Sequence, residues 1–345
     1  MEESFPMNGG NCEYSYSRNS CRQKKAAERA KQYLLDGIVD HFDIEDTSSS
    51  QFTIADLGCS TGPNTFVSME NIIQGITQTY KIKGYSTLPE FQVYFNDHIS
   101  NDFNTLFLNL PSNRNYFACG VPGTFHGRLF PRASLNFVYS AFAMQWLSKA
   151  PEELNDLNSE VCNRGRIHYA NAPAEVCEAY ATQYAADMAS FLAARAEEVA
   201  PGGLMAFIIP GRPDGTLASE YSLGQVFHIV EFCLLDMANE GIVSKEKLDL
   251  FNLPLYSPSI EELKKLIEKN GKFSIAKLEA HEEDTKIPPS GYCRAGFESI
   301  VKKHFGSEII EELFERYKRK HAEMYHIVAA DFVSLSVFVL LKRHL

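Results

Sequence analysis

The chain has 345 residues, a formal net charge of −11 at neutral pH and a pI near 5.4. Nucleic acids and anionic membrane surfaces bind clustered basic side chains, so this acidic balance disfavours both kinds of partner. The length exceeds the usual single-domain size of about 100 to 150 residues. It fits one elaborated α/β domain, or a core with an inserted cap.

The N-terminus and the cysteines indicate the compartment. Residues 1–6 are acidic and contain neither a basic nor an apolar segment, so we expect no secretory signal. No apolar run reaches the roughly 18 residues that a membrane-spanning helix needs. The eight cysteines are scattered without a C-x-x-C pair, which is typical of reduced thiols and not of a disulfide framework or a zinc site. We therefore expect a cytoplasmic protein.

Hydrophobic periodicity predicts alternating helices and strands, and hence an α/β fold with a mostly parallel sheet. Residues 1–21 are interpreted as an ordered polar arm with neither helix nor strand. After it, we expect strands at 52–57, 91–95, 116–121, 135–142, 204–209, 273–278 and 333–341. Helical patterns occupy residues 22–41, 67–80, 174–199, 211–251, 261–270 and 307–325. The acidic and proline-containing stretch 282–289 is interpreted as a solvated loop.

Residues 52–64 are the most informative stretch of the chain. A short apolar run leads into a turn with two glycines, and a helical pattern follows from about Thr65. Gly58 and Gly62 allow a ligand to approach the backbone closely. Asp56 lies near the carboxyl end of the strand, where open parallel sheets bind cofactors. This pattern predicts a cofactor site at the first strand-to-helix turn.

The spacing and charge of this turn distinguish between cofactors. A dinucleotide site needs three glycines, as G-x-G-x-x-G, to bring a pyrophosphate to a helix N-terminus, whereas this turn has two glycines four residues apart. Asp56 would repel a phosphate but suits a cationic ligand. S-adenosylmethionine carries a sulfonium and an ammonium group and no phosphate, so the residues favour it over NAD. An ordinary turn without a ligand is the alternative at this point.

Two further residues follow predicted strands. Asp97 comes just after the strand at 91–95, where doubly wound folds place an acid on a ribose diol. Trp146, the only tryptophan, lies just after the strand at 135–142. A buried indole N–H needs an acceptor, so this position favours a binding role beside the alternative of core packing.

Six motifs resemble, in order, those of a known family: SYSRNSCRQ (15–23), IADLGCSTGPN (54–64), FND (95–97), GVPGTF (120–125), WLS (146–148) and FNLP (251–254). They resemble the plant SABATH methyltransferases, and the likeness runs nearly end to end. The resemblance implies a Rossmann-like class I methyltransferase core with an α-helical cap, and usually a homodimer. We expect the core at 22–210 with 272–345, the cap at 211–271, and an arm at 1–21 over the active site.

The resemblance further implies methyl transfer from S-adenosylmethionine to the carboxylate of a small plant acid. The implied cofactor contacts are Tyr16, Ser20, Asp56, Cys59, Asn64, Asp97, His98, Thr124 and Phe125. The implied substrate contacts are Gln23, Phe142, Gln145, Trp146, Phe227, Tyr256 and Phe332. Some members also bind Mg²⁺, and that site would map to Asn163, Asp249, the Phe251 carbonyl and Asn252. A structural hydrogen-bond cluster is the alternative for these four residues.

Four residues depart from the family pattern and bear on the acceptor. Asn8 stands where carboxyl-methylating members often have Lys, Phe142 where Tyr is frequent, and Gln145 where Met or His precedes the Trp. Thr124 replaces a usual Ser and keeps its hydroxyl. Gln before Trp is also found in members that methylate xanthine nitrogens, so a nitrogen acceptor is the first alternative. A non-catalytic acid-binding protein and an NAD(P)-dependent oxidoreductase are remoter ones.

Methyl transfer to a carboxylate needs alignment and no general base. An acid with a pKa of about 4 to 5 is ionised at neutral pH. The in-line displacement gains most of its rate from proximity and orientation. Two donors must aim one carboxylate oxygen, and we assign this catalytic role to the Gln23 amide and the Trp146 N–H, inside an aromatic cavity.

Overall fold

A single mixed sheet of seven strands lies at the centre of the structure, a computed structural model that describes residues 5–44, 50–157, 159, 161–324 and 334–345. The strands are β1 (Gln51–Leu57), β2 (Glu90–Asp97), β3 (Tyr116–Pro122), β4 (Leu135–Ala141), β5 (Val199–Gly211), β6 (Phe273–Glu282) and β7 (Leu335–Arg343). Their order across the sheet is β3-β2-β1-β4-β5-β7-β6.

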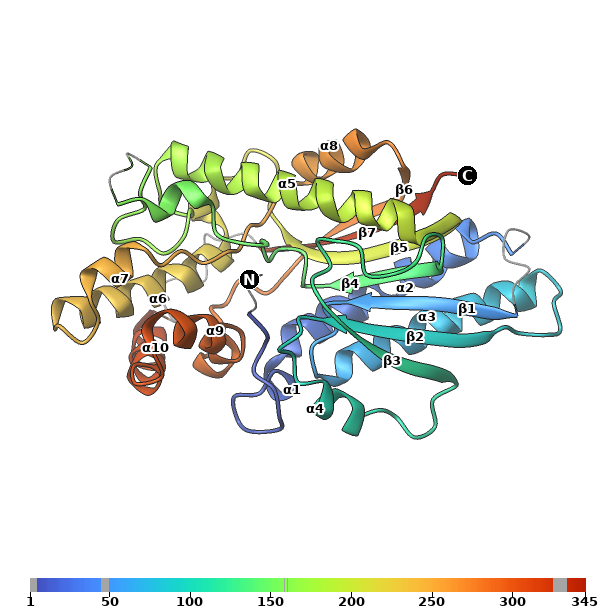
Figure 1. Cartoon of the computed structure of the whole chain (residues 1–345), viewed down its shortest axis with the longest axis horizontal. Coiled ribbons are helices and arrows are strands. Elements are labelled where there is room, and N and C mark those ends of the chain that lie inside the picture. Colours follow the sequence, from blue (N-terminus) through green and yellow to red (C-terminus); the bar gives the residue numbers. More distant parts are fainter. Residues whose placement is uncertain (1–4, 45–49, 158, 160, 325–333) are drawn as a thin grey trace.

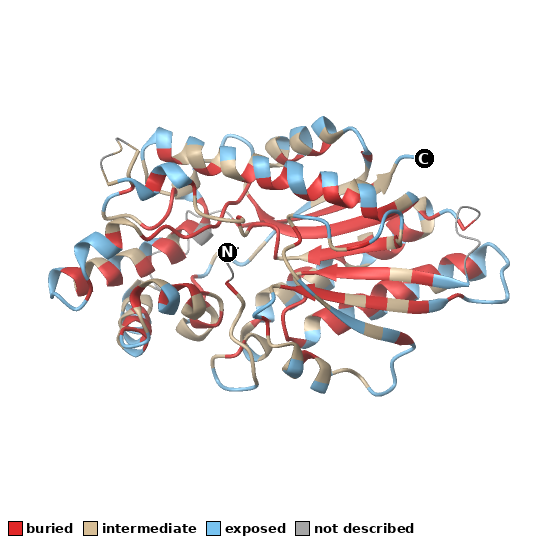
Figure 2. Ribbon diagram, viewed as in Figure 1, coloured by how far each residue is buried: buried red, intermediate tan, exposed pale blue. Residues whose placement is uncertain are grey.

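The pairing confirms the predicted mostly parallel sheet. Strands β1 to β5 pair in parallel, and β7 runs antiparallel between β5 and β6. The central strands are buried on both faces, as Figure 2 shows. Strands buried in this way have nearly continuous apolar sequences, and such apolar runs made β1 and β5 predictable from the sequence.

Helices cover both faces of the sheet (Figure 1). One layer consists of α2 (Cys21–His41), α3 (Pro63–Ile82) and α4 (Phe103–Leu108), and the opposite layer of α5 (Ala174–Glu198) and α8 (Ile260–Asn270). Side chains alternate along a strand, so those of β1 point in turn toward one helix layer and toward the other. Phe52 and Ile54 join the core formed with α2 and α3, whereas Ala55 and Leu57 join the core formed with α5.

A third group of helices forms a lobe beside the sheet. It contains α6 (Ser222–Asn239), α7 (Lys245–Asp249), α9 (Ser290–Phe305) and α10 (Ile310–Met324), and it has its own apolar core. In Figure 1 the lobe lies next to the end of the sheet at which β1 terminates. The predicted cap at 211–271 differs from this grouping, because α8 packs against α5 and β6, while α10 packs against both α6 and α9.

Two helices near the site were not predicted. The arm contains one helical turn, α1 (Tyr16–Asn19), although we expected the arm to lack helix. The helix α9 follows the predicted loop, and Gly291 and Gly296 weaken its helical signal. Its buried apolar residues nevertheless recur at helical spacing: Cys293, Phe297, Ile300 and Val301. None of the helices in the described part of the chain is both long and apolar enough to cross a bilayer.

Candidate active site

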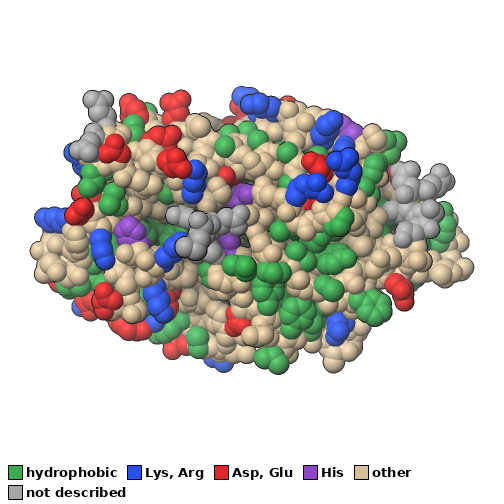
Figure 3. All heavy atoms as spheres, viewed as in Figure 1, with side chains coloured by type: hydrophobic (Ala, Val, Ile, Leu, Met, Phe, Trp, Pro, Cys, Tyr) green, Lys and Arg blue, Asp and Glu red, His purple; other side chains and the backbone are tan. Residues whose placement is uncertain are grey.

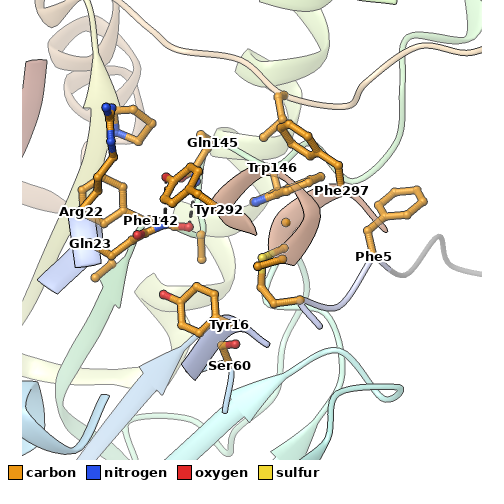
Figure 4. Close-up of a pocket in the computed structure, with 18 of the residues that line it drawn as sticks. Phe5, Tyr16, Arg22, Gln23, Ser60, Phe142, Gln145, Trp146, Tyr292 and Phe297 are labelled. Carbon is orange, nitrogen blue, oxygen red and sulfur yellow. Dashed lines mark hydrogen bonds between the residues drawn. The ribbon is translucent and has the colours of Figure 1, made fainter. Parts of the chain in front are cut away.

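A cavity lies between the carboxyl ends of β1, β2 and β4, the arm and the helical lobe (Figure 4). The predicted site residues that line it are Tyr16, Gln23, Asp97, His98, Phe125, Phe142, Gln145 and Trp146. They come from separate segments of the chain, which the fold brings to one edge of the sheet. Their individual roles stay predictions.

Asp97 presents its carboxylate to the cavity at the end of β2. Its side chain is 9% exposed, and its two oxygens accept the backbone N–H groups of Ser60 at 2.7 Å and His98 at 2.8 Å. These bonds fix the carboxylate and leave lone pairs for a ligand diol. Burial raises the pKa of Asp97 above its ordinary value, and the two N–H groups partly oppose that shift.

The turn after β1 approaches the loop after β4 very closely. Gly58 has a φ of +82°, and a Cβ there would lie 2.3 Å from the Cβ of Ala143, so only glycine fits. Ser60 and Phe142 line the cavity from the same two segments and have φ angles of 51° and 54°. Such left-handed conformations cost about 1 to 3 kcal/mol each for residues with a side chain. Backbone strain is therefore concentrated at this edge of the sheet.

Asp56, Cys59 and Thr124 lie close to the cavity but do not line it. Asp56 is 3% exposed and accepts a hydrogen bond from the Thr65 hydroxyl, and its burial raises its pKa to about 7. Cys59 is buried in the core on the α3 side of the sheet. Thr124 Oγ1 accepts the N–H of His126 at 3.3 Å. All three support turns that shape the site, and their implied cofactor contacts stay predictions.

The arm is attached to the cofactor turn through Ser20 and Asn64. Asn64 Nδ2 donates to the carbonyl of Ser20 at 3.2 Å and to its hydroxyl at 3.0 Å. Gly62 leaves room for the Tyr16 ring, whose nearest atom lies 3.1 Å from where a Cβ would be. Tyr16 therefore closes over the turn, while Ser20 and Asn64 hold the arm in place.

Trp146 lies in a loop that is fixed on both sides. It pairs with Leu255 in an isolated antiparallel bridge. Two residues later, the backbone N–H and the hydroxyl of Ser148 donate to the carboxylate of Asp187 at 2.8 Å and 2.6 Å. Asp187 belongs to α5, so the loop is attached to the helix layer on the sheet as well as to the segment between α7 and α8.

The indole of Trp146 is packed between aromatic rings. The ring centroids of Phe5 and Phe297 each lie 6.4 Å from that of Trp146. Within the described chain, the indole N–H has no hydrogen-bond partner, and in Figure 4 it points toward Tyr292. This donor is available to a ligand.

Gln23 and Gln145 present two different amides to the cavity. Gln23 Nε2 donates to the hydroxyl of Tyr292 at 3.1 Å, and its buried Oε1 has no partner. Rotating this amide by half a turn would let Oε1 accept from Tyr292 and would free both N–H donors for a ligand. Gln145 Nε2 donates to the Phe142 carbonyl at 2.8 Å, and its Oε1 is also buried without a partner.

Two other predicted substrate contacts, Phe227 and Tyr256, do not line this cavity. Phe227, on α6, is 3% exposed and packs on His168 with ring centroids 4.0 Å apart. The buried Tyr256 donates from its hydroxyl to the carboxylate of Glu262 at 2.9 Å. Phe332 lies outside the described residues. Contacts of these three residues with a substrate stay predictions.

The residues of the implied magnesium site lie together, away from this cavity. Asn163 Nδ2 donates to Asn252 Oδ1 at 3.1 Å, and Asp249 Oδ1 accepts the N–H of Gly165 at 2.8 Å. The buried Asn163 Oδ1 has no partner, so one hard oxygen is available to a cation. Phe251 is buried next to Asn252. The donor set fits a weakly held Mg²⁺, although two of its oxygens already accept protein hydrogen bonds.

Several cavity walls were not assigned from the sequence: Phe5, Met7, Asn19, Arg22, Ser60, Tyr221, Tyr292 and Phe297. The apolar stripe of α9 was the available signal for Phe297, and Tyr292 directly precedes Cys293 in that stripe. Arg22 was signalled only by its place next to Gln23, and Phe5 lies in a polar arm without periodicity.

The cavity has the features that S-adenosylmethionine requires. Asp97 can accept from a ribose diol, Phe125 offers an aromatic face, and Gly58 permits close approach of the backbone. No phosphate-binding glycine pattern is present in this turn.

Comparison with known proteins agrees with this geometry. Residues 2–344 match the family described as SAM dependent carboxyl methyltransferase. The loganic acid O-methyltransferase of Catharanthus roseus is 41% identical, with 99% of this chain and 95% of that protein covered. The farnesoic acid carboxyl-O-methyltransferase of Arabidopsis thaliana is 37% identical over the full length of both chains. A 3,7-dimethylxanthine N-methyltransferase of Camellia sinensis var. assamica is 35% identical, with 96% and 92% covered.

A solved structure confirms the fold. Loganic acid methyltransferase with SAH superposes with a TM-score of 0.93 at 41% identity, covering 98% of this chain and 99% of the other. Both the expected methyltransferase fold and the expected cofactor class are thereby confirmed. The chain belongs to the family of S-adenosylmethionine-dependent carboxyl methyltransferases.

Proposed function

We propose that the protein transfers a methyl group from S-adenosylmethionine to the carboxylate of a small plant acid and releases the methyl ester. The observation that carries this proposal is the placement of Gln23 and Trp146, two side chains with available donors, on the cavity that also exposes Asp97. The names of two relatives, for loganic and farnesoic acids, support a carboxylic acid as acceptor.

The two ends of the cavity would bind different molecules, the cofactor near Asp97 and the acid near Gln23 and Trp146. S-adenosylmethionine supplies a methyl group on a positively charged sulfur, already activated for transfer. Asp97 would accept from the ribose hydroxyls. The N–H groups of Gln23 and Trp146 would donate to one carboxylate oxygen and aim the other at the methyl carbon. Phe142 and Phe297 exclude water, which strengthens these polar interactions.

Replacing the two donors tests the assignment. Trp146→Phe keeps most of the packing and removes the N–H, and a hydrogen bond to a charged group contributes roughly 1.5 to 3 kcal/mol. We therefore expect kcat/KM to fall about ten- to a hundredfold on the best acid, and Gln23→Ala to cost a similar amount. The two losses should not add fully, because both donors orient one group. Intact acid methylation by Trp146→Phe would contradict the proposal.

A nitrogen acceptor is the second candidate, and Gln145 is the residue that favours it. Its unpartnered Oε1 could accept an N–H of a xanthine-like ring. The same oxygen could equally accept a hydroxyl of an acid substrate, so it does not decide the question. Offering acids and xanthines side by side with labelled S-adenosylmethionine separates the two, and exclusive methylation of a xanthine would overturn the first candidate. Tight acid binding without turnover would instead indicate a non-catalytic binding protein.

For Asn163 and its neighbours we propose Mg²⁺ as a weakly held ligand, beside the structural hydrogen-bond cluster that the existing bonds favour. The test is the unfolding temperature and the activity with Mg²⁺ and with a chelator, for the wild type and for Asp249→Asn. If neither the unfolding temperature nor the activity of the wild type changes with Mg²⁺ or with the chelator, the proposed metal site is wrong.

We also propose that the protein is a cytoplasmic homodimer. Figure 3 shows hydrophobic side chains gathered over the part of the molecule where β2 and β3 lie, and Phe117 on the edge strand β3 is 59% exposed. Exposed apolar surface of this kind is typical of protein interfaces. Sedimentation analysis of the wild type and Phe117→Lys tests this, and a monomeric wild type would contradict it.

A further inference from the structure

Arg22 is a cation in the cavity wall to which the proposed function gives no role. It is the second residue of α2 and lies next to Gln23. Its guanidinium carbon lies 5.9 Å from the centre of the Tyr292 ring, and one N–H group donates to the carbonyl of Lys286. A half-buried guanidinium loses hydration, so its remaining donors need partners.

No acid of the described chain neutralises Arg22, since its contacts are a carbonyl and an aromatic ring. Glu283, which also lines the cavity, is already engaged: it pairs with Arg29 and accepts the hydroxyl of Ser336 at 2.7 Å. Among the described residues, most of the five N–H donors of Arg22 therefore lack a partner, and no carboxylate offsets its positive charge.

The position of Arg22 is also unfavourable for the helix that carries it. The N-terminal end of a helix carries partial positive charge, which disfavours a cation there. The first turn of α2 contains no acidic residue that would offset this effect. Helix stability therefore does not explain the arginine, whereas an anionic ligand would.

Arg22 lies on the side of the cavity where the proposed methyl-accepting substrate would bind. Ser20, two residues earlier, faces Asn64 at the cofactor turn, whereas Arg22 and Gln23 both contact Tyr292 of α9. In Figure 4, Arg22 and Trp146 lie on opposite sides of Tyr292. An acceptor held by Gln23 and Trp146 at its reacting carboxylate would therefore extend its other end along Tyr292 toward Arg22.

On the basis of the proposed carboxyl methylation, we infer that Arg22 determines specificity by binding a second carboxylate of the acceptor, so that the protein prefers dicarboxylic acids and forms their half esters. The planar guanidinium matches a carboxylate with two parallel N–H donors. In the reaction, one oxygen of the first carboxylate forms the bond to the methyl carbon, the methyl–sulfur bond breaks, and the sulfur keeps the electron pair. The second carboxylate stays ionised on Arg22.

A purely structural role makes a different prediction. If Arg22 only held the segment around Lys286 through its hydrogen bond, its replacement would change stability and would lower activity on all acids alike. A specificity role changes the ratio of kcat/KM between acids that differ only in the second charge. This ratio is the readout, because it is insensitive to a general loss of active protein.

The experiment uses pairs of acids of matched length, each a dicarboxylic acid and its monomethyl ester, in several aliphatic and aromatic lengths. The variants are Arg22→Gln, which keeps N–H donors without charge, and Arg22→Lys, which keeps the charge without the planar fork. The matched control is Lys25→Gln, which removes the same charge from an exposed residue of the same helix outside the cavity. Calorimetric titration of the S-adenosylhomocysteine complex with each pair provides a readout independent of turnover.

We expect the wild type and Lys25→Gln to prefer the best diacid over its half ester by about tenfold or more, as one charge-assisted pair allows. Arg22→Gln should bring this ratio near one, and Arg22→Lys should lie between. A wild type without this preference, or an Arg22→Gln variant with the wild-type ratio, would overturn the inference while leaving carboxyl methylation intact. If the wild type binds S-adenosylhomocysteine but methylates no acid of either kind, the proposed function itself fails.

Discussion

The pair formed by Ser148 and Asp187 positions the Trp146 loop, and Ser148→Ala is the smallest change that tests this. The Asp187 carboxylate is 7% exposed and accepts the N–H and hydroxyl of Ser148 at 2.8 Å and 2.6 Å, together with Gln183 Nε2 at 3.0 Å. The variant removes one bond to a charged acceptor. It keeps the hydrogen bond from the Ser148 backbone N–H, so the loop loses only part of its attachment, and the buried Asp187 carboxylate still has hydrogen-bond donors.

The expected magnitude follows from that single bond. A hydrogen bond to a charged group contributes roughly 1.5 to 3 kcal/mol, part of which Gln183 and solvent would replace. We expect the free energy of unfolding to fall by about 1 to 2 kcal/mol. Trp146 lies two residues away, and a small displacement of an orienting donor lowers the rate strongly. We therefore expect kcat/KM on the best acid to fall about tenfold.

Two measurements separate loop displacement from general instability. Trp146 is the only tryptophan, so its fluorescence reports on this loop alone, and its emission should change in Ser148→Ala. The control is Ser134→Ala, which removes an exposed 2.8 Å bond from the Ser134 hydroxyl to the Pro131 carbonyl, away from the cavity. If Ser148→Ala loses stability but keeps the emission and kcat/KM of the control, Asp187 does not position the tryptophan.

Three further outcomes are expected. Asp97→Ala should weaken S-adenosylmethionine binding at least about tenfold by calorimetry, since it removes bonds worth roughly 1.5 to 3 kcal/mol, and unchanged affinity would remove Asp97 from the site. Tyr292→Phe should lower kcat on acids by leaving the Gln23 amide unoriented, with cofactor affinity unchanged; equal kcat would assign the tyrosine to packing alone. Burial lowers the pKa of His168 from 6.5 to about 3, so the unfolded chain binds the proton first and stability falls as pH drops below 6.5. The free energy of unfolding should fall by about 2 kcal/mol at about pH 5, and this loss should vanish in His168→Gln. The raised pKa of Asp56 has the opposite effect, because it stabilises the folded protein as pH falls. Denaturant unfolding of the variant is therefore compared with that of the wild type at each pH.

The sheet and the cofactor turn were predictable because their signals are local. The apolar runs of β1 and β5 reflect strands that are covered on both faces, and the glycines after β1 reflect a close approach that the structure places at Gly58 and Ala143. Asp97 followed from its place at a strand end. These features depend on neighbours in the sequence or on one rule of sheet topology.

The cap and the part of the cavity proposed to bind the acid were less predictable from the sequence, because both depend on contacts between distant segments of the chain. Gly296 weakens the pattern of α9, so Tyr292 and Phe297 were not assigned to the cavity. The division between core and cap follows helix packing, and sequence order gives no measure of that. Tyr256 illustrates the limit: its hydroxyl bonds to Glu262 in a buried aromatic cluster, and no local signal distinguishes such a tyrosine from one that faces a ligand.

The charges around the cavity suit a reaction in which two opposite charges disappear. A sulfonium and a carboxylate become a thioether and an ester, so the transition state is less polar than the separated ions. Surroundings poor in water favour that change, and the rings of Phe142, Trp146 and Phe297 supply them. In the proposed arrangement, Asp97 would retain the cofactor through hydroxyl groups that do not react. A cation at Arg22, apart from the Gln23 and Trp146 donors, can bind an anion without lowering the nucleophilicity of the oxygen that is methylated, since it acts on a different group of the same molecule.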